Sequence, residues 1–122
     1  MSRRIIAAVE DLVFASKILA TAESLGVELQ LARSAESLIS NARSRKPDLI
    51  IVDLQIQRFD PLQLGRQLKV SDDLRTVPLI GFFSHVLTGL KQQAVAAGFD
   101  TVLPRSVFAR DVADILAGKQ TG

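Results

Sequence analysis

Three apolar segments of this sequence are followed directly by polar side chains that can take part in chemistry. Residues 49–52 precede Asp53, residues 4–9 precede Glu10 and Asp11, and residues 77–83 precede Ser84 and His85. If each segment is a strand of a parallel sheet, these side chains meet at the carboxyl edge, where open α/β sheets bind ligands. Asp53 therefore lies where ligand chemistry is expected, although by position alone it could equally cap a loop.

The segment Leu49-Ile50-Ile51-Val52 is apolar at every position, so it is amphipathic at neither the helical nor the strand period. This pattern is typical of a strand that is buried on both faces in a parallel sheet covered by helices. The segment 4–9 has the same design. Residues 27–31 alternate apolar and polar side chains, which predicts a strand at the edge of the sheet.

Helical spacing of apolar residues predicts a helix after each strand. Gly26 is placed to end the first helix, Ser34 to cap the second, and Asp60 followed by Pro61 to begin the third. The predicted helices cover residues 13–25, 34–46, 60–70, 87–97 and 107–116, and a short last strand covers 101–103. Strands that alternate with helices in this way predict an α/β fold, a doubly wound five-stranded parallel sheet with helices on both faces.

Length and composition fit one folded domain, which we assign to residues 1–118, with a C-terminal tail at 119–122. The chain has no cysteine, and its start lacks the apolar region of a signal peptide, so a cytoplasmic location is expected. No segment reaches the ~18 apolar residues that span a membrane. A formal charge of +2 is too balanced to indicate nucleic-acid binding.

The order and spacing of these residues resemble the receiver domain of two-component response regulators over nearly the whole chain. In that family an acid pair ends the first strand, a phosphate-accepting Asp ends the third, and a Ser or Thr ends the fourth. Glu10 and Asp11, Asp53, and Ser84 match these positions. The loop from Asp53 to Leu62 also looks like the family's loop. The resemblance implies a flavodoxin-like or CheY-like sheet with strand order 2-1-3-4-5.

The resemblance also implies a role for each residue. Asp53 would accept a phosphoryl group as a nucleophile, and Mg²⁺ would offset the negative charge. Glu10, Asp11, Asp53 and the backbone carbonyl of Gln55 would hold the metal. The hydroxyl of Ser84 and a cation after strand five would bind the phosphoryl oxygens.

The sequence departs from the family at strand five, where the family has Lys followed by Pro. Here Pro104 stands at the lysine position and Arg105 follows it, so Arg105 is the candidate displaced cation. Thr101 or Val102 replaces the aromatic residue that moves when typical receivers are phosphorylated. Counted back from Gly26, the acid pair starts one residue late, so Glu10 alone is an alternative to the pair.

Other interpretations of the polar residues remain open. Glu10 and Asp11 would also suit the start of the first helix, where the helix dipole favours acids. Ser84 would serve as an ordinary loop hydroxyl, and His85 as a solvated loop residue.

Three functions follow from these observations. The first is a stand-alone receiver-like protein that does not catalyse a reaction and has a weak or absent phosphorylation switch. It would bind a histidine kinase or another signalling protein, or pair with itself through the fourth helix, fifth strand and fifth helix. The second is a working receiver that is phosphorylated on Asp53 with Mg²⁺. The third is a small-molecule binder on the same fold, which is disfavoured because no glycine-rich phosphate loop follows any strand.

Overall fold

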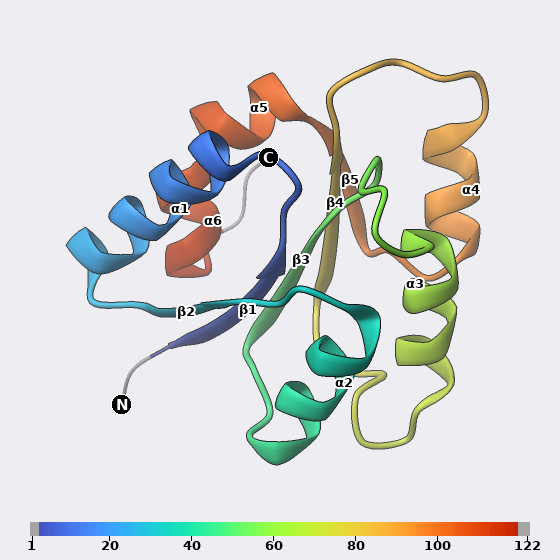
Figure 1. Ribbon diagram of the computed structural model, residues 1–122, viewed down its shortest axis with the longest axis horizontal. Coiled ribbons are helices and arrows are strands. Elements are labelled where there is room, and N and C mark those ends of the chain that lie inside the picture. The colour runs from blue at the N-terminus through green and yellow to red at the C-terminus, as the bar shows by residue number, and fades with distance from the viewer. Residues whose placement is uncertain (1–2, 120–122) are drawn as a thin grey trace.

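The computed structural model describes residues 3–119 and contains one parallel sheet (Figure 1). The strand order β2-β1-β3-β4-β5 confirms the predicted order. The strands are β1 (Arg4–Ala8), β2 (Glu28–Leu31), β3 (Leu49–Asp53), β4 (Leu79–Phe83) and β5 (Thr101–Pro104). Every residue of β1 and β3 is buried, as their apolar sequences predict, and β2 lies at an edge, as its alternation predicts.

Helices connect the strands and largely begin and end where the sequence places them. They are α1 (Leu12–Leu25), α2 (Ala35–Ser44), α3 (Pro61–Val70), α4 (Leu90–Ala96), α5 (Arg105–Arg110) and α6 (Val112–Ala117). Ser34 caps α2 and Asp60 caps α3 through their side chains, and Gly26 ends α1 with a φ of 69°. These caps satisfy backbone groups that a helix end leaves without a partner.

Two predicted helices differ from the observed ones. The helix expected at 87–97 begins only at Leu90, because Gly89, with a φ of 81°, ends the β4–α4 loop in a left-handed turn. The helix expected at 107–116 starts directly after β5 at Arg105 and divides at Asp111, whose φ of −103° and ψ of 11° interrupt the regular helix. Residues 120–122 of the predicted tail lie outside the described residues. No helix within residues 3–119 has the length and apolar character that a membrane crossing requires.

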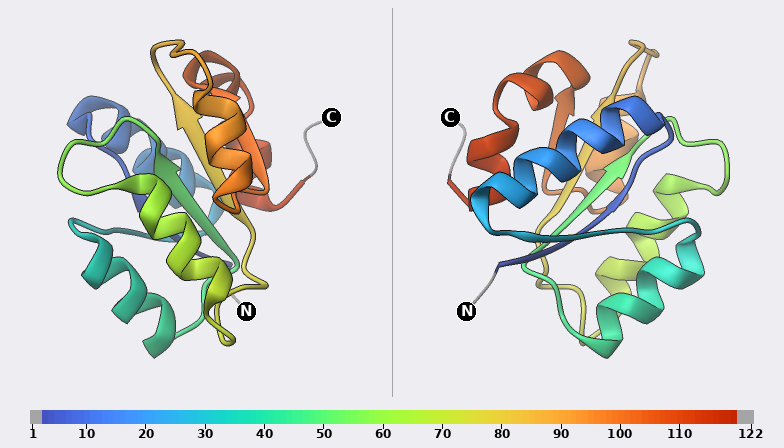
Figure 2. Two further views of the ribbon diagram at one scale, coloured as in Figure 1. Left: turned by 90° about the vertical axis from the view of Figure 1, so that its right-hand side faces the viewer. Right: turned by 60° about the vertical axis from the view of Figure 1, so that its left-hand side comes forward.

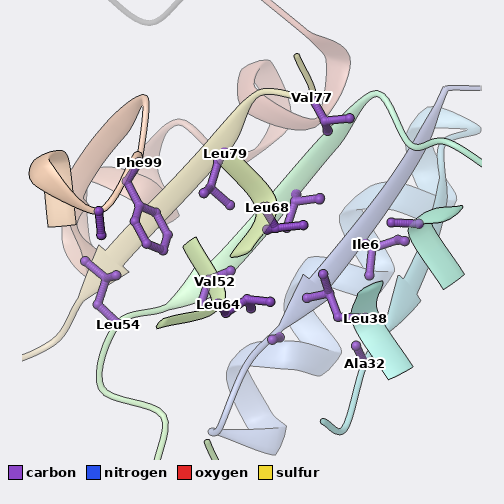
Figure 3. Close-up of a cluster of buried hydrophobic side chains, with 14 of the residues drawn as sticks. Ile6, Ala32, Leu38, Val52, Leu54, Leu64, Leu68, Val77, Leu79 and Phe99 are labelled. Carbon is purple, nitrogen blue, oxygen red and sulfur yellow. The ribbon is translucent and has the colours of Figure 1, made fainter. Parts of the chain in front are cut away.

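The helices cover the sheet on both faces and enclose two apolar cores (Figures 1 and 2). On one face, α1, α5 and α6 cover a core that contains three packed phenylalanines, Phe14, Phe82 and Phe108. On the other face, α2, α3 and α4 cover a larger core (Figure 3). Helices therefore cover both faces of the sheet, and the loops that follow the strands lie at its carboxyl edge.

Packing in the second core also fixes the start of the loop after β3. Leu54 lies beside Phe99 in this core (Figure 3). A Cβ atom at Gly81 would lie 2.9 Å from side-chain atoms of both Leu54 and Phe99, so only glycine leaves room for them at that position of β4. Because Leu54 follows Asp53, this packing holds the carboxylate of Asp53 at the end of the sheet.

Candidate functional site

A cleft of about 700 Å³ lies at the carboxyl edge of the sheet. It collects the side chains that the sequence placed at strand ends, together with residues of the β3–α3 and β4–α4 loops. The lining includes Glu10, Asp11, Asp53, Gln55, Ser84, His85 and Arg105. The strand ends therefore bring the expected residues to one place, and their individual contacts decide what the cleft can do.

Asp53 is the buried acid of the cleft, with only 7% of its surface exposed. One carboxylate oxygen accepts a hydrogen bond from the backbone N–H of Gln55 at 2.9 Å, and the other accepts a longer one from Glu10 N–H at 3.4 Å. Burial raises the pKa of Asp53, because a charged carboxylate loses its hydration there, while the two N–H groups oppose this shift. Asp53 is thus held rigidly by backbone donors and lacks full compensation for its charge.

Glu10 contacts the β3–α3 loop. Its two carboxylate oxygens accept hydrogen bonds from the backbone N–H of Gln57 at 3.0 Å and from Nε of Arg58 at 3.1 Å. Arg58 also donates to the backbone carbonyl of Val9 at 3.1 Å. The guanidinium group of Arg58 therefore neutralises Glu10 and connects the residues after β1 with the loop after β3.

Asp11 has a capping role and a cationic partner. One oxygen accepts from the backbone N–H groups of Val13 and Phe14, which makes Asp11 the N-cap of α1. The other oxygen accepts from Arg105 at 2.9 Å. The hydrogen bond from Arg105 is the main cause that lowers the pKa of Asp11. The helix-capping interpretation thus describes Asp11, whereas Glu10 faces the loop.

Arg105 reaches the cleft from the first position of α5, and its guanidinium carbon lies 4.1 Å from the centre of the Phe14 ring. This stacking adds a cation–π contact to the ion pair with Asp11. The guanidinium group of Arg105 is therefore oriented toward α1.

Pro104, at the position of the family's lysine, is exposed at the end of β5, while Thr101 is half-buried and Val102 is buried.

Gln55 joins the two loops that flank the cleft. Its side-chain oxygen Oε1 accepts from the backbone N–H of Ser84 at 2.7 Å and of His85 at 2.9 Å, while its Nε2 donates to the His85 carbonyl at 2.8 Å. The residues Ser84 and His85 are both exposed. The side chain of Gln55 thus links the two loops. This contact is separate from the role as a metal ligand that the family resemblance implies for its backbone carbonyl.

Two of the three acids at this edge already have cationic partners. Among residues 3–119, no group of three or more acidic or histidine side chains is arranged to hold a metal ion. Glu10 and Asp11 already accept hydrogen bonds from arginine side chains, so each has fewer lone pairs free for a metal ion. Mg²⁺ prefers oxygen ligands in near-octahedral geometry and brings its own waters, so it would need these ion pairs to open.

Two contacts in the cleft were not foreseen from the sequence, those of Arg58 in the β3–α3 loop and of the Gln55 side chain. A signal for Arg58 exists, because a basic residue in the loop after Asp53 approaches the same edge as Glu10. For Gln55 no sequence pattern points to the contact, because the chain folds so that backbone groups 30 residues away converge on its side chain.

Comparisons with known proteins found similar sequences and similar folds. The polar-differentiation response regulator DivK of Brucella anthropi is 26% identical over 85 residues, which are 70% of this chain and 69% of that protein. The receiver domain of a signal transduction histidine kinase from Syntrophus aciditrophicus has a TM-score of 0.79 and 25% identity, with 99% of this chain and 96% of that chain covered.

A third protein of similar fold was solved with a metal ion bound. The receiver domain of the sensor histidine kinase PA1611 from Pseudomonas aeruginosa, with a magnesium ion in its active-site cleft, has a TM-score of 0.78 and 21% identity; the match covers 98% of this chain and 100% of that chain. The family model for the response regulator receiver domain matches residues 6–117. Receiver domains are modules of two-component signalling that interact with histidine kinases or other signalling proteins. This chain belongs to the response regulator receiver domain family.

Proposed function

We propose that this receiver domain acts as a protein-interaction module whose binding surface is present without phosphorylation. In this role it signals by binding and catalyses no reaction. The observation that carries the proposal is the pairing of two of the three acids of the cleft with arginines, Glu10 with Arg58 and Asp11 with Arg105.

The arginine pairs change the charge balance at the cleft. In a receiver that depends on magnesium, the cation offsets the repulsion between the acids and an incoming phosphoryl group. Here two guanidinium groups already offset two of the three carboxylates. A divalent cation would gain little from the remaining charge on Asp53 and would have to displace charge-assisted hydrogen bonds that are stronger than neutral ones.

Strand five supports the same function. Pro104 replaces the lysine that in the family binds the phosphoryl oxygens, and Arg105 is oriented toward Asp11 and Phe14. A ligand shifts a conformational equilibrium only by its difference in affinity for the two states. A phosphoryl group without the family's lysine therefore produces a small shift. The surface formed by α4, β5 and α5 is then available to a partner or to a second copy without phosphorylation.

Phosphorylation of Asp53 is the second candidate function. It is favoured by the position of Asp53, which is held by two backbone N–H groups in a cleft that Ser84 also lines. In this alternative a histidine kinase supplies the phosphoryl group.

The two functions are separated by two measurements on the wild-type chain. Intact mass after incubation with acetyl phosphate and Mg²⁺ reports the phosphorylated fraction, with Asp53→Asn as the control that lacks the acceptor. Sedimentation or partner titration with and without beryllofluoride reports the switch. We expect a change in affinity of less than about tenfold, equivalent to 1.4 kcal/mol. A larger change would establish a working switch and overturn the proposal.

A further inference from the structure

The side chain of Gln55 occupies a place that is built to receive an oxygen atom. Two consecutive backbone N–H groups, those of Ser84 and His85, converge on Oε1 at 2.7 and 2.9 Å. The partial positive charges of these two N–H groups add at a single point, which favours an oxygen acceptor, and we call this N–H pair the nest. The oxygen found in this nest belongs to a neutral carboxamide of the same chain.

The third hydrogen bond of this side chain makes the arrangement specific to an amide. Nε2 donates to the carbonyl of His85 at 2.8 Å, so the carboxamide uses both its acceptor and its donor on one short segment. A carboxylate would keep the acceptor and lose the donor. Glutamine therefore supplies both the acceptor and the donor that the backbone of the β4–α4 loop requires.

We propose that Gln55 is the resident ligand of an oxyanion site formed by the N–H groups of Ser84 and His85. The external ligand with which Gln55 would compete is a tetrahedral oxyanion such as phosphate, the class that the family resemblance already implies at this edge. With Gln55 in place, the backbone of Ser84 and His85 is held by a side chain of the same chain. This inference deepens the proposed function, and it depends on that function for its regulatory meaning.

The position of Gln55 explains why the internal ligand competes with an external one. Its own backbone N–H donates to Asp53 at 2.9 Å, so the residue that holds the buried carboxylate also fills the nest. Both groups line the same cleft. An oxyanion that approaches Asp53 meets the N–H pair of the loop only after the carboxamide has moved away.

The loop that Gln55 fixes carries exposed apolar side chains. Val86 and Leu87 follow the nest directly and are 88% and 57% exposed. A loop with few buried contacts keeps one conformation only when its backbone groups are bound. The hydrogen bonds of Gln55 therefore also restrict the positions of Val86 and Leu87 at the surface.

The test is amide hydrogen exchange followed by NMR on the full chain, without any phosphoryl donor. In Gln55→Ala we expect exchange at Ser84 and His85 to accelerate about tenfold, since their acceptor is removed. Gln55→Glu, which keeps an acceptor oxygen, should retain most of the protection. The matched control is Gln57→Ala in the same loop, because the Gln57 side chain makes no hydrogen bond within residues 3–119. Unchanged exchange in Gln55→Ala, or equal acceleration in Gln57→Ala, would overturn the proposal.

A second arm tests the ligand class with inorganic phosphate as the probe. Phosphate should shift the amide signals of Ser84 and His85 in Gln55→Ala at lower concentration than in the wild type. Equal titration curves for the two proteins would also overturn the assignment of the nest as an oxyanion site. Neither the exchange experiment nor the phosphate titration measures partner affinity. A large effect of beryllofluoride on partner affinity in the wild type would refute the proposed function. The role of Gln55 would still be decided by the exchange and titration results.

Discussion

Replacement of Asp53 by asparagine should stabilise the fold at neutral pH. Burial raises the pKa of Asp53 above its usual value, so the ionised form is disfavoured in the folded state. The folded protein therefore binds a proton at Asp53 more readily than the unfolded chain does. The resulting penalty is present above the folded-state pKa and disappears as the pH falls below the unfolded value of 3.8.

The size of the gain follows from the contacts that change. Asparagine keeps an oxygen for the Gln55 N–H and loses only the long hydrogen bond from Glu10 N–H at 3.4 Å. Removal of a poorly compensated buried charge outweighs that loss, and we expect a net gain of about 1 kcal/mol. For a domain of this length, this corresponds to a melting temperature higher by about 4 °C.

Urea denaturation at pH 7.5 and at pH 3 measures both the gain and its pH dependence. Asp11→Asn is the matched control, because Arg105 lowers the pKa of Asp11 and asparagine remains a good N-cap. The charge of Asp11 contributes stability above the unfolded pKa, and this contribution is lost as the pH falls through the lower folded-state pKa. Asp11→Asn should therefore be less stable than the wild type at pH 7.5. An Asp53→Asn protein that is no more stable than the wild type at pH 7.5, or whose gain persists at pH 3, would refute the reasoning.

Three further outcomes are expected. Mg²⁺ should raise the melting temperature of Arg58→Ala more than that of the wild type or of the control Arg66→Ala, because Glu10 loses its guanidinium partner; equal shifts by scanning fluorimetry would count against arginine neutralisation. Arg105→Ala should raise the pKa of Asp11 in an NMR titration, and an unchanged value would show that their hydrogen bond is absent in solution. Phe108→Ala should cost about 3–5 kcal/mol in urea denaturation, since Phe108 is fully buried; a cost below about 1 kcal/mol would contradict the packing.

The fold was predictable because its signals are local and mutually consistent. The apolar segment before Asp53 is typical of a strand buried on both faces, and the caps at Ser34, Asp60 and Gly26 repeat known helix-end chemistry. The start of α4 was missed because it depends on the left-handed conformation of Gly89. Helical spacing begins earlier in the sequence and does not report the backbone conformation of a single residue.

The residues of the cleft were predictable, whereas their partners were not. Strand ends fix where Asp53, Glu10 and Ser84 lie, because parallel strands share one carboxyl edge. The partner of each side chain depends on loop conformation, which leaves no period in the sequence. Arg58 and Gln55 both contact residues of other strand ends, so their roles become visible only once the loops have folded around the sheet.

A last prediction concerns Pro104, whose presence at the lysine position is the simplest sequence-based reason for a weak switch. Pro104 is exposed and has a φ of −59° and a ψ of 147°, values that lysine adopts freely, so Pro104→Lys should fold normally. Yet the nest on the β4–α4 loop would still be filled by Gln55, and Glu10 would still be bound by Arg58. A lysine then adds little difference in affinity between two states of the loop, so Pro104→Lys alone should change the effect of beryllofluoride on self-association by less than about tenfold.

The double variant Pro104→Lys with Gln55→Ala should exceed that factor, because the loop is then free to respond. Recovery of a large response by Pro104→Lys alone would show that the missing lysine, and not the internal ligand, disables the switch.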